Sequence, residues 1–131
     1  MGKVKNSNKR VSIFREKLHK GLVQEIEIKK KLVDTKSKFQ RIQIFDTYAY
    51  GRVLALDGIV QITEKDEAAY SEMLVHPAMN IIKSPSKILV IGGGDGAVAE
   101  ELLKYQYITN IDLVDIDPEV IKLSNTYLKK I

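Results

Sequence analysis

The sequence predicts an α/β protein in which a small N-terminal antiparallel β-domain precedes the first β-α-β-α segment of a Rossmann-like, doubly wound sheet. Three observations support this prediction. Apolar and polar residues alternate with the period of strands in the first half of the chain, whereas the spacing after Thr63 is helical. A glycine-rich loop, 92–96, then directly follows the unbroken apolar run Ile88–Ile91, as expected after a central parallel strand.

Charge and composition limit the class of protein. Residues 1–41 contain 13 Lys and Arg against 4 Asp and Glu, whereas residues 42–131 contain 8 against 13. Residues 1–20 are predicted to form a basic N-terminal arm, and a solvated surface is favoured there over a nucleic-acid site because the charges are scattered. The absence of cysteine excludes disulfides and thiolate metal sites, and no apolar run approaches the roughly 18 residues of a membrane span. These features predict a cytoplasmic protein with neither a membrane nor a nucleic-acid partner.

The β-domain is predicted over residues 21–65. Its last two strands are separated by Asp57-Gly58, a strong hairpin signal because both residues tolerate positive φ. Four strands can bury one face of a sheet. The predicted strands cover residues 22–28, 39–45, 52–56 and 59–62.

Residues 66–86 are predicted to bridge the β-domain and the second domain as a helix and a turn. Asp66 and Glu67 place carboxylates at the helix N-terminus, where they suit the helix dipole. Pro77 is expected to interrupt the helix, which makes His76 a helix-end residue. The only histidines, His19 and His76, lie in no ligand-spaced cluster, so no metal site is predicted.

Residues 87–131 are predicted to form an incomplete nucleoside-binding domain. A doubly wound sheet needs further strands to cover its central strand on both faces, so the rest of the active site is expected beyond Ile131. The predicted elements are the strand 88–91, a helix from Ala97 to about Tyr105, the strand 111–114 and a helix opened by Pro118 with Asp117 as its cap.

The glycine loop carries the clearest chemical signal. Its sequence, Gly92-Gly93-Gly94-Asp95-Gly96-Ala97, matches G-x-G-x-x-A between a strand and a helix, and Asp115 follows roughly 20 positions later, as in nucleoside-binding loops. Gly92, Gly93, Gly94 and Gly96 let the backbone approach a ligand closely. Asp115 is placed to accept hydrogen bonds from both ribose hydroxyls. A plain tight turn would not need four glycines in five residues.

Asp95 favours one class of nucleoside over another. A dinucleotide would place its pyrophosphate against this loop, where a carboxylate repels it. A sulfonium nucleoside, such as S-adenosylmethionine or its decarboxylated form, would be attracted. The alternative that Asp95 serves only as an N-cap to the following helix stays open at this point.

Four ordered stretches resemble the spermidine synthases and related polyamine aminopropyltransferases. They are Phe39-Gln40, the run from Gly51 to Gln61, the run from Asp66 to Met73, and the run from Ile91 to Gly96. The resemblance implies a methyltransferase-type α/β domain and transfer of an aminopropyl group from decarboxylated S-adenosylmethionine to a diamine such as putrescine, which yields spermidine and methylthioadenosine. It further implies that decarboxylated S-adenosylmethionine acts as a co-substrate, with no permanently bound cofactor, and that the full-length enzyme is a homo-oligomer.

Position by position, the resemblance implies roles for individual residues. Gln40 would contact the nucleoside, Tyr70 would line the diamine channel and Asp95 would bind an amine. Asp115 stands where the family usually has Glu. Ser71 stands where bacterial members commonly have His, so it belongs to the substrate-binding set but leaves the acceptor open.

No catalytic residue is expected within this chain, because the family's catalytic Asp lies in a later loop, and the chain alone is expected to be inactive. Three other functions remain open. The first is a dinucleotide-dependent oxidoreductase, which Asp95 disfavours. The second is a diamine N-methyltransferase that uses S-adenosylmethionine. The third is a non-catalytic binding or assembly module.

Overall fold

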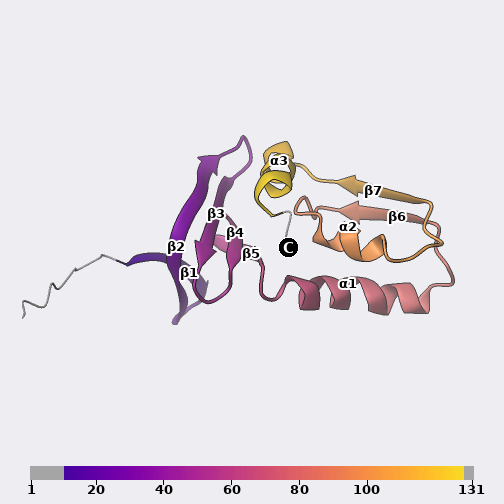
Figure 1. The fold of residues 1–131 in the computed structure, drawn as a ribbon, viewed down its shortest axis with the longest axis horizontal. Helices are drawn as coiled ribbons and strands as arrows, with labels where there is room; N and C mark the ends of the chain where they lie inside the picture. Colours follow the sequence, from indigo (N-terminus) through magenta and orange to yellow (C-terminus); the bar gives the residue numbers. More distant parts are fainter. Residues whose placement is uncertain (1–10, 129–131) are drawn as a thin grey trace, which may run out of the picture.

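In the computed structural model, which describes residues 11–128, two β-sheets are arranged with α3 between them, while α1 and α2 run along one face of the second sheet (Figure 1). The first sheet is antiparallel with strand order β1-β2-β3-β4-β5, and the second pairs β6 and β7 in parallel. The predicted α/β fold is therefore confirmed. Among residues 11–128, no helix has the length and apolar character needed to cross a membrane. The elements are β1 (Ser12–His19), β2 (Leu22–Lys36), β3 (Arg41–Thr47), β4 (Arg52–Leu56), β5 (Ile59–Thr63), α1 (Glu67–Ile81), β6 (Lys87–Ile91), α2 (Ala97–Leu102), β7 (Asn110–Val114) and α3 (Pro118–Tyr127).

Strand β1 lies within the segment predicted as a basic arm, so that prediction is wrong for residues 12–19; residues 1–10 lie outside the described part of the chain. β1 pairs with the first half of β2, and Phe14 stands opposite Ile26. Only Phe14 and Glu16 are buried in this strand. The apolar alternation is weak because one of its two buried positions is a carboxylate, and this explains why the pattern was missed.

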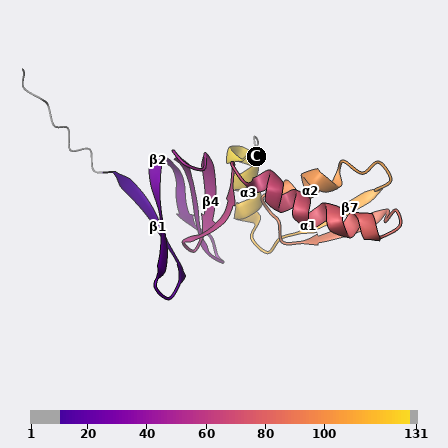
Figure 2. The ribbon, with the colours of Figure 1, turned by 90° about the horizontal axis from the view of Figure 1, so that it is seen from below.

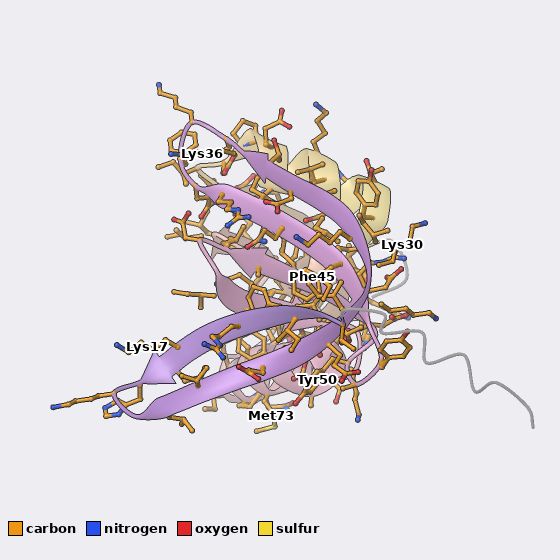
Figure 3. All side chains as sticks on the ribbon, turned by 90° about the vertical axis from the view of Figure 1, so that its left-hand side faces the viewer. Lys17, Lys30, Lys36, Phe45, Tyr50 and Met73 are labelled. Carbon is orange, nitrogen blue, oxygen red and sulfur yellow. The ribbon has the colours of Figure 1, made fainter. Side chains whose placement is uncertain are left out.

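Strand β2 bends and wraps the first sheet into a half-barrel. Its register shifts between Ile28 and Lys30 and again between Lys31 and Val33, and such bulges increase the local twist of a strand. Figure 3 shows the two halves of β2 diverging near Lys30, with Phe45 in the concave space between them. This inner face is closed by a buried cluster of Phe14, Ile26, Phe45, Val53 and Ala55.

The opposite face of β3, β4 and β5 packs against the second domain. Because side chains alternate between the two faces of a strand, Val53 and Ala55 point into the half-barrel while Leu54 points toward the helices. Figure 2 shows α3 packed between this sheet and the rest of the molecule. The contact is apolar and joins Ile42, Ile44, Leu54 and Ile62 to Ala97, Val120 and Leu128.

Helix α1 does not stop at Pro77, contrary to the prediction. It continues to Ile81 with Pro77 inside it. Pro77 lies on an exposed side of the helix, where water can hydrogen-bond the carbonyl that lacks its usual N–H donor. The buried side of α1, formed by Ser71, Val75 and Met79, is unaffected.

The second sheet is covered on one face only within residues 11–128. Ile88, Val90 and Ile111 pack with α1 and α2, whereas the side chains of Leu89 and Ile91 on the other face are 60% and 83% exposed. This uncovered face agrees with the prediction of an incomplete doubly wound sheet, which needs further strands to cover Ile88–Ile91 on both faces.

Candidate functional site

A pocket of about 610 Å³ lies at the carboxyl ends of β6 and β7, where the glycine loop leaves β6. Ligands of open α/β sheets bind at this edge. One wall is formed by the second domain, through the glycine loop and the residues after β7. The other wall is formed by the β-domain, so that Gln40, Leu54, Leu56 and Gln61 face Ile91–Asp95, Val114–Ile116 and Val120.

The glycine loop requires glycine for two different reasons. Gly92, Gly93 and Gly96 have φ angles of +81°, +73° and +92°, a region that L side chains rarely adopt. Gly94 is required for space, because a Cβ atom there would lie 2.7 Å from the Oδ2 atom of Asp115. The loop backbone is thereby held against the pocket.

Asp115 links the glycine loop to the segment after β7 through its two carboxylate oxygens. Oδ2 accepts a hydrogen bond from the Gly94 N–H at 2.9 Å, and Oδ1 accepts one from the Asp117 N–H at 2.8 Å. Each oxygen keeps a second lone pair, and Asp115 lines the 610 Å³ pocket. The residue is therefore positioned to accept further hydrogen bonds from a ligand, while its ribose contact stays a prediction.

Asp95 is not the N-cap of α2, because that position is Gly96, but it precedes the cap and still binds an amide of the helix. Its Oδ1 accepts a hydrogen bond from the Ala97 N–H at 3.0 Å, which satisfies an amide in the first turn of α2. The same residue lines both the 610 Å³ pocket and a second pocket of about 250 Å³. Among the described residues no donor reaches its Oδ2. The Asp95 carboxylate group therefore stands where the two pockets adjoin.

The second pocket brings together Tyr70, Ser71 and Asp95, the three residues to which the resemblance gives a substrate-binding role. The Tyr70 side chain is 64% exposed. Ser71 is fully buried, and its Oγ has no hydrogen-bond partner in the described part of the chain. A buried hydroxyl without a partner is unusual and marks a place where a ligand or water can be bound. The remaining wall is largely apolar and includes Leu74, Val90 and Val98.

Gln40 is held at the first pocket by a residue whose role the sequence did not reveal. Its Nε2 donates a hydrogen bond of 3.0 Å to the Oδ2 atom of Asp117. Asp117 was predicted only as the cap of α3, and it does cap that helix. Burial acts to raise the pKa of Asp117, but hydrogen bonds from Ser37, Gln40 and the backbone of α3 outweigh it and hold this pKa below its usual range.

His76 lies in the middle of α1 and lines neither pocket, so its prediction as a helix-end residue is wrong. Its Nε2 is 3.0 Å from a Glu101 oxygen, and its Nδ1 is 2.6 Å from the Tyr105 hydroxyl. Glu72, His76 and Glu101 place possible ligand atoms within 4.8 Å of one another. However, the Lys104 ammonium lies 2.5 and 2.6 Å from the two Glu101 oxygens and already balances that charge, so we assign no metal to this cluster.

Comparison with known families gives two successive matches. The family described as "Spermidine synthase tetramerisation domain" matches residues 12–64, and the one described as "Spermine/spermidine synthase domain" matches residues 67–131. A spermidine synthase of Schizosaccharomyces pombe is 46% identical over 108 residues, which are 82% of this chain and 36% of the relative. A polyamine aminopropyltransferase of Prochlorococcus marinus subsp. pastoris is 52% identical over 102 residues, 78% of this chain and again 36% of the relative. The chain thus spans little more than a third of these relatives.

Solved structures show the same similarity. The crystal structure of spermidine synthase from Thermotoga maritima superposes with a TM-score of 0.90 at 36% identity and covers 93% of this chain and 43% of that one. A spermidine synthase in complex with the transition-state analogue AdoDATO has the same TM-score and identity and covers 93% and 42%. The resemblance seen in the four sequence motifs is confirmed.

Proposed function

Because this chain belongs to the spermidine synthase and polyamine aminopropyltransferase family, we propose that it carries the donor-binding region of an aminopropyltransferase and part of the acceptor site. The donor is decarboxylated S-adenosylmethionine and the acceptor is putrescine or a related diamine. The names of the relatives support aminopropyl transfer over methyl transfer.

The reaction that fits two adjoining pockets is a displacement at carbon. The nitrogen lone pair of the acceptor forms a C–N bond with the aminopropyl carbon next to sulfur, while the C–S bond breaks and its electrons neutralise the sulfonium. Methylthioadenosine leaves, and the product amine loses one proton. We assign no residue of this chain as the group that removes that proton.

The position of Asp95 is the observation that carries the proposal. It lines both pockets, one large enough for a nucleoside and one smaller. A sulfonium nucleoside and a diamine are both cations, and each must exchange water for an anionic partner when it binds. A carboxylate at the boundary can serve the amine ends of both substrates. It would repel the pyrophosphate of a dinucleotide.

The roles that we assign to the remaining site residues come from the family resemblance and are supported by their positions in the two pockets. In the first pocket Asp115 accepts hydrogen bonds from the ribose, the glycine loop approaches the nucleoside and the side-chain amide of Gln40 contacts it from the β-domain. In the second pocket Tyr70 and Ser71 contact the acceptor.

Equilibrium dialysis tests the proposal directly on the purified chain. Decarboxylated S-adenosylmethionine and methylthioadenosine should be retained, weakly because the pocket is open, whereas NADH should not be retained. Retention of NADH in preference to the two sulfur nucleosides would contradict the assignment, and so would a failure to retain either nucleoside at millimolar concentration.

We also propose that the protein forms a homo-oligomer through its β-domain. The description of the family that matches residues 12–64 supports this, and so do apolar side chains around the β1–β2 hairpin. These side chains are about half exposed: Val11 55%, Ile13 51%, Leu18 50%, Leu22 56% and Val23 48%. Light scattering of the purified chain should give a mass above that of a monomer, and Ile13→Lys with Val23→Lys should lower it. A monomeric wild type would refute the proposal.

A further inference from the structure

We propose that Asp117 is a positioning residue for nucleoside binding, whose buried carboxylate ties the turn between β2 and β3 to the start of α3 and thereby fixes Gln40 at the wall of the 610 Å³ pocket. The inference rests on the proposed function, since the ligand concerned is the adenosine part of the donor. Asp117 itself does not line the pocket.

Asp117 uses one oxygen as a helix cap and the other as a link between the two domains. Its side chain is fully buried. Oδ1 accepts a hydrogen bond from the Glu119 N–H at 3.1 Å, which is the ordinary N-cap contact. Oδ2 accepts hydrogen bonds from the Ser37 hydroxyl at 2.7 Å and from Gln40 Nε2 at 3.0 Å, residues that lie 80 and 77 positions earlier in the chain. A cap alone requires only the first of these contacts.

The turn that carries Gln40 depends on the same link. The Ser37 hydroxyl oxygen accepts hydrogen bonds from the Phe39 and Gln40 N–H groups at 3.0 and 3.1 Å while it donates to Asp117. Figure 1 shows this turn, at the end of the half-barrel, reaching toward α3. The shape of the turn and its attachment to the second domain therefore both depend on the hydroxyl group of Ser37.

A continuous chain of hydrogen bonds connects the two walls of the pocket. Gln40 donates to Asp117, the Asp117 N–H donates to Asp115, and Asp115 accepts from the Gly94 N–H. Its ends, Gln40 and Gly94, both line the pocket from opposite domains. Displacement of the Asp117 carboxylate therefore releases the Gln40 side chain from its fixed position at the pocket wall.

The link also preorganises Gln40. One amide hydrogen is held by Asp117, which leaves the second amide hydrogen and the carbonyl oxygen for a ligand. A side chain that is already fixed loses less conformational freedom on binding. Since the hydrogen bonds keep the Asp117 pKa low despite burial, the carboxylate remains charged and these bonds are charge-assisted.

The test measures methylthioadenosine affinity of the 131-residue chain by equilibrium dialysis. Asp117→Asn keeps a good N-cap, because Asn caps helices about as well as Asp, but it replaces a charged acceptor. We expect roughly five- to tenfold weaker binding, the effect of one lost hydrogen bond. Ser37→Ala should weaken binding similarly, and Ser37→Thr, which keeps the hydroxyl, should restore most of the affinity.

A double substitution separates positioning from a general structural role. Because Asp117 acts through Gln40, Gln40→Ala combined with Asp117→Asn should bind no more weakly than Gln40→Ala alone. Additive losses would overturn the inference, as would wild-type affinity in Asp117→Asn. If the wild-type chain binds no methylthioadenosine, both the proposed function and this inference are refuted. If Asp117→Asn does not fold, the comparison of Ser37→Ala with Ser37→Thr decides, and equal affinities there would also overturn the inference.

Discussion

Substitution of Gly94 by alanine should disable the nucleoside pocket through a single steric contact. The new Cβ atom would lie 2.7 Å from Asp115 Oδ2, 3.0 Å from its Cγ and 3.2 Å from Ile121 Cγ1. Asp115 cannot turn away freely, because its other oxygen accepts the Asp117 N–H. Either the loop or the carboxylate must therefore move, and the Gly94–Asp115 hydrogen bond is lost.

The expected magnitudes follow from these contacts. A lost hydrogen bond to a charged group costs about 1.5–3 kcal/mol, and overpacking typically costs about 1–3 kcal/mol. We therefore expect the free energy of unfolding to fall by about 2–4 kcal/mol, since part of the strain is relieved by the movement itself. If Asp115 accepts hydrogen bonds from the ribose, as proposed, its displacement should weaken methylthioadenosine binding roughly 10- to 150-fold.

Urea denaturation and equilibrium dialysis measure the two effects separately, and Gly58→Ala is the matched control. Gly58 has a φ of +79° in the β4–β5 turn, and a Cβ atom there would meet nothing within 4 Å. Gly58→Ala should lose about 1–2 kcal/mol of stability through backbone strain while methylthioadenosine affinity is unchanged. Wild-type affinity in Gly94→Ala, or an equal loss of affinity in Gly58→Ala, would refute this reasoning.

Four further predictions concern other parts of the site. Asp95→Asn should weaken the binding of cationic decarboxylated S-adenosylmethionine roughly 10- to 150-fold in dialysis but leave uncharged methylthioadenosine nearly unaffected; equal losses for both ligands would contradict the charge argument. Ser71→His should change the order in which putrescine and longer diamines bind in the presence of methylthioadenosine, and an identical order would remove Ser71 from acceptor recognition. The chain by itself, given decarboxylated S-adenosylmethionine and putrescine, should form no spermidine above background, because nothing assigned in it removes the amine proton; multiple turnover would contradict this. The pKa of the Asp117 carboxyl is lowered from 3.8 in the folded protein, so the charged carboxylate stabilises the fold fully above pH 3.8 and loses this effect as the pH falls through the folded-state pKa. The difference in unfolding free energy between the wild type and Asp117→Asn should therefore become smaller in acid. A difference that does not change with pH would argue against a charged carboxylate.

Features with a local cause could be predicted from the sequence. The Asp57-Gly58 hairpin forms as expected, with both residues at positive φ between β4 and β5. The glycine loop and the two helices that flank β7 were predicted for the same reason, since their signals are contained in a few neighbouring residues. The pairing of Tyr70 and Ser71 with Asp95 in one pocket is a longer-range feature, and it was accessible only through the family resemblance.

Features that depend on distant contacts were missed. β1 is a strand because it pairs with β2, although its own pattern is weak. Pro77 is tolerated because tertiary packing buries the other side of α1, which a local rule for proline does not include. For Asp117, the local signal for a helix cap was correct. Because a cap is a sufficient reason for Asp at this position, nothing in the sequence indicated its hydrogen bonds to Ser37 and Gln40.

The location of the pocket between two domains couples ligand binding to domain docking. Walls from the β-domain and from the glycine loop must be in register before both can contact one nucleoside, and that register is set by the apolar contact around Ile44, Leu54 and Val120 and by the Arg52 side chain, which donates a hydrogen bond to the Tyr127 carbonyl. A ligand that binds only the docked arrangement must stabilise it, by an amount set by the ligand concentration relative to its dissociation constant. By the same linkage, a substitution that loosens this contact between the domains lowers the affinity for the ligand, even when the substituted residue does not contact the ligand. Affinity for the nucleoside is thus a property of the junction between the two domains as much as of the residues that line the pocket.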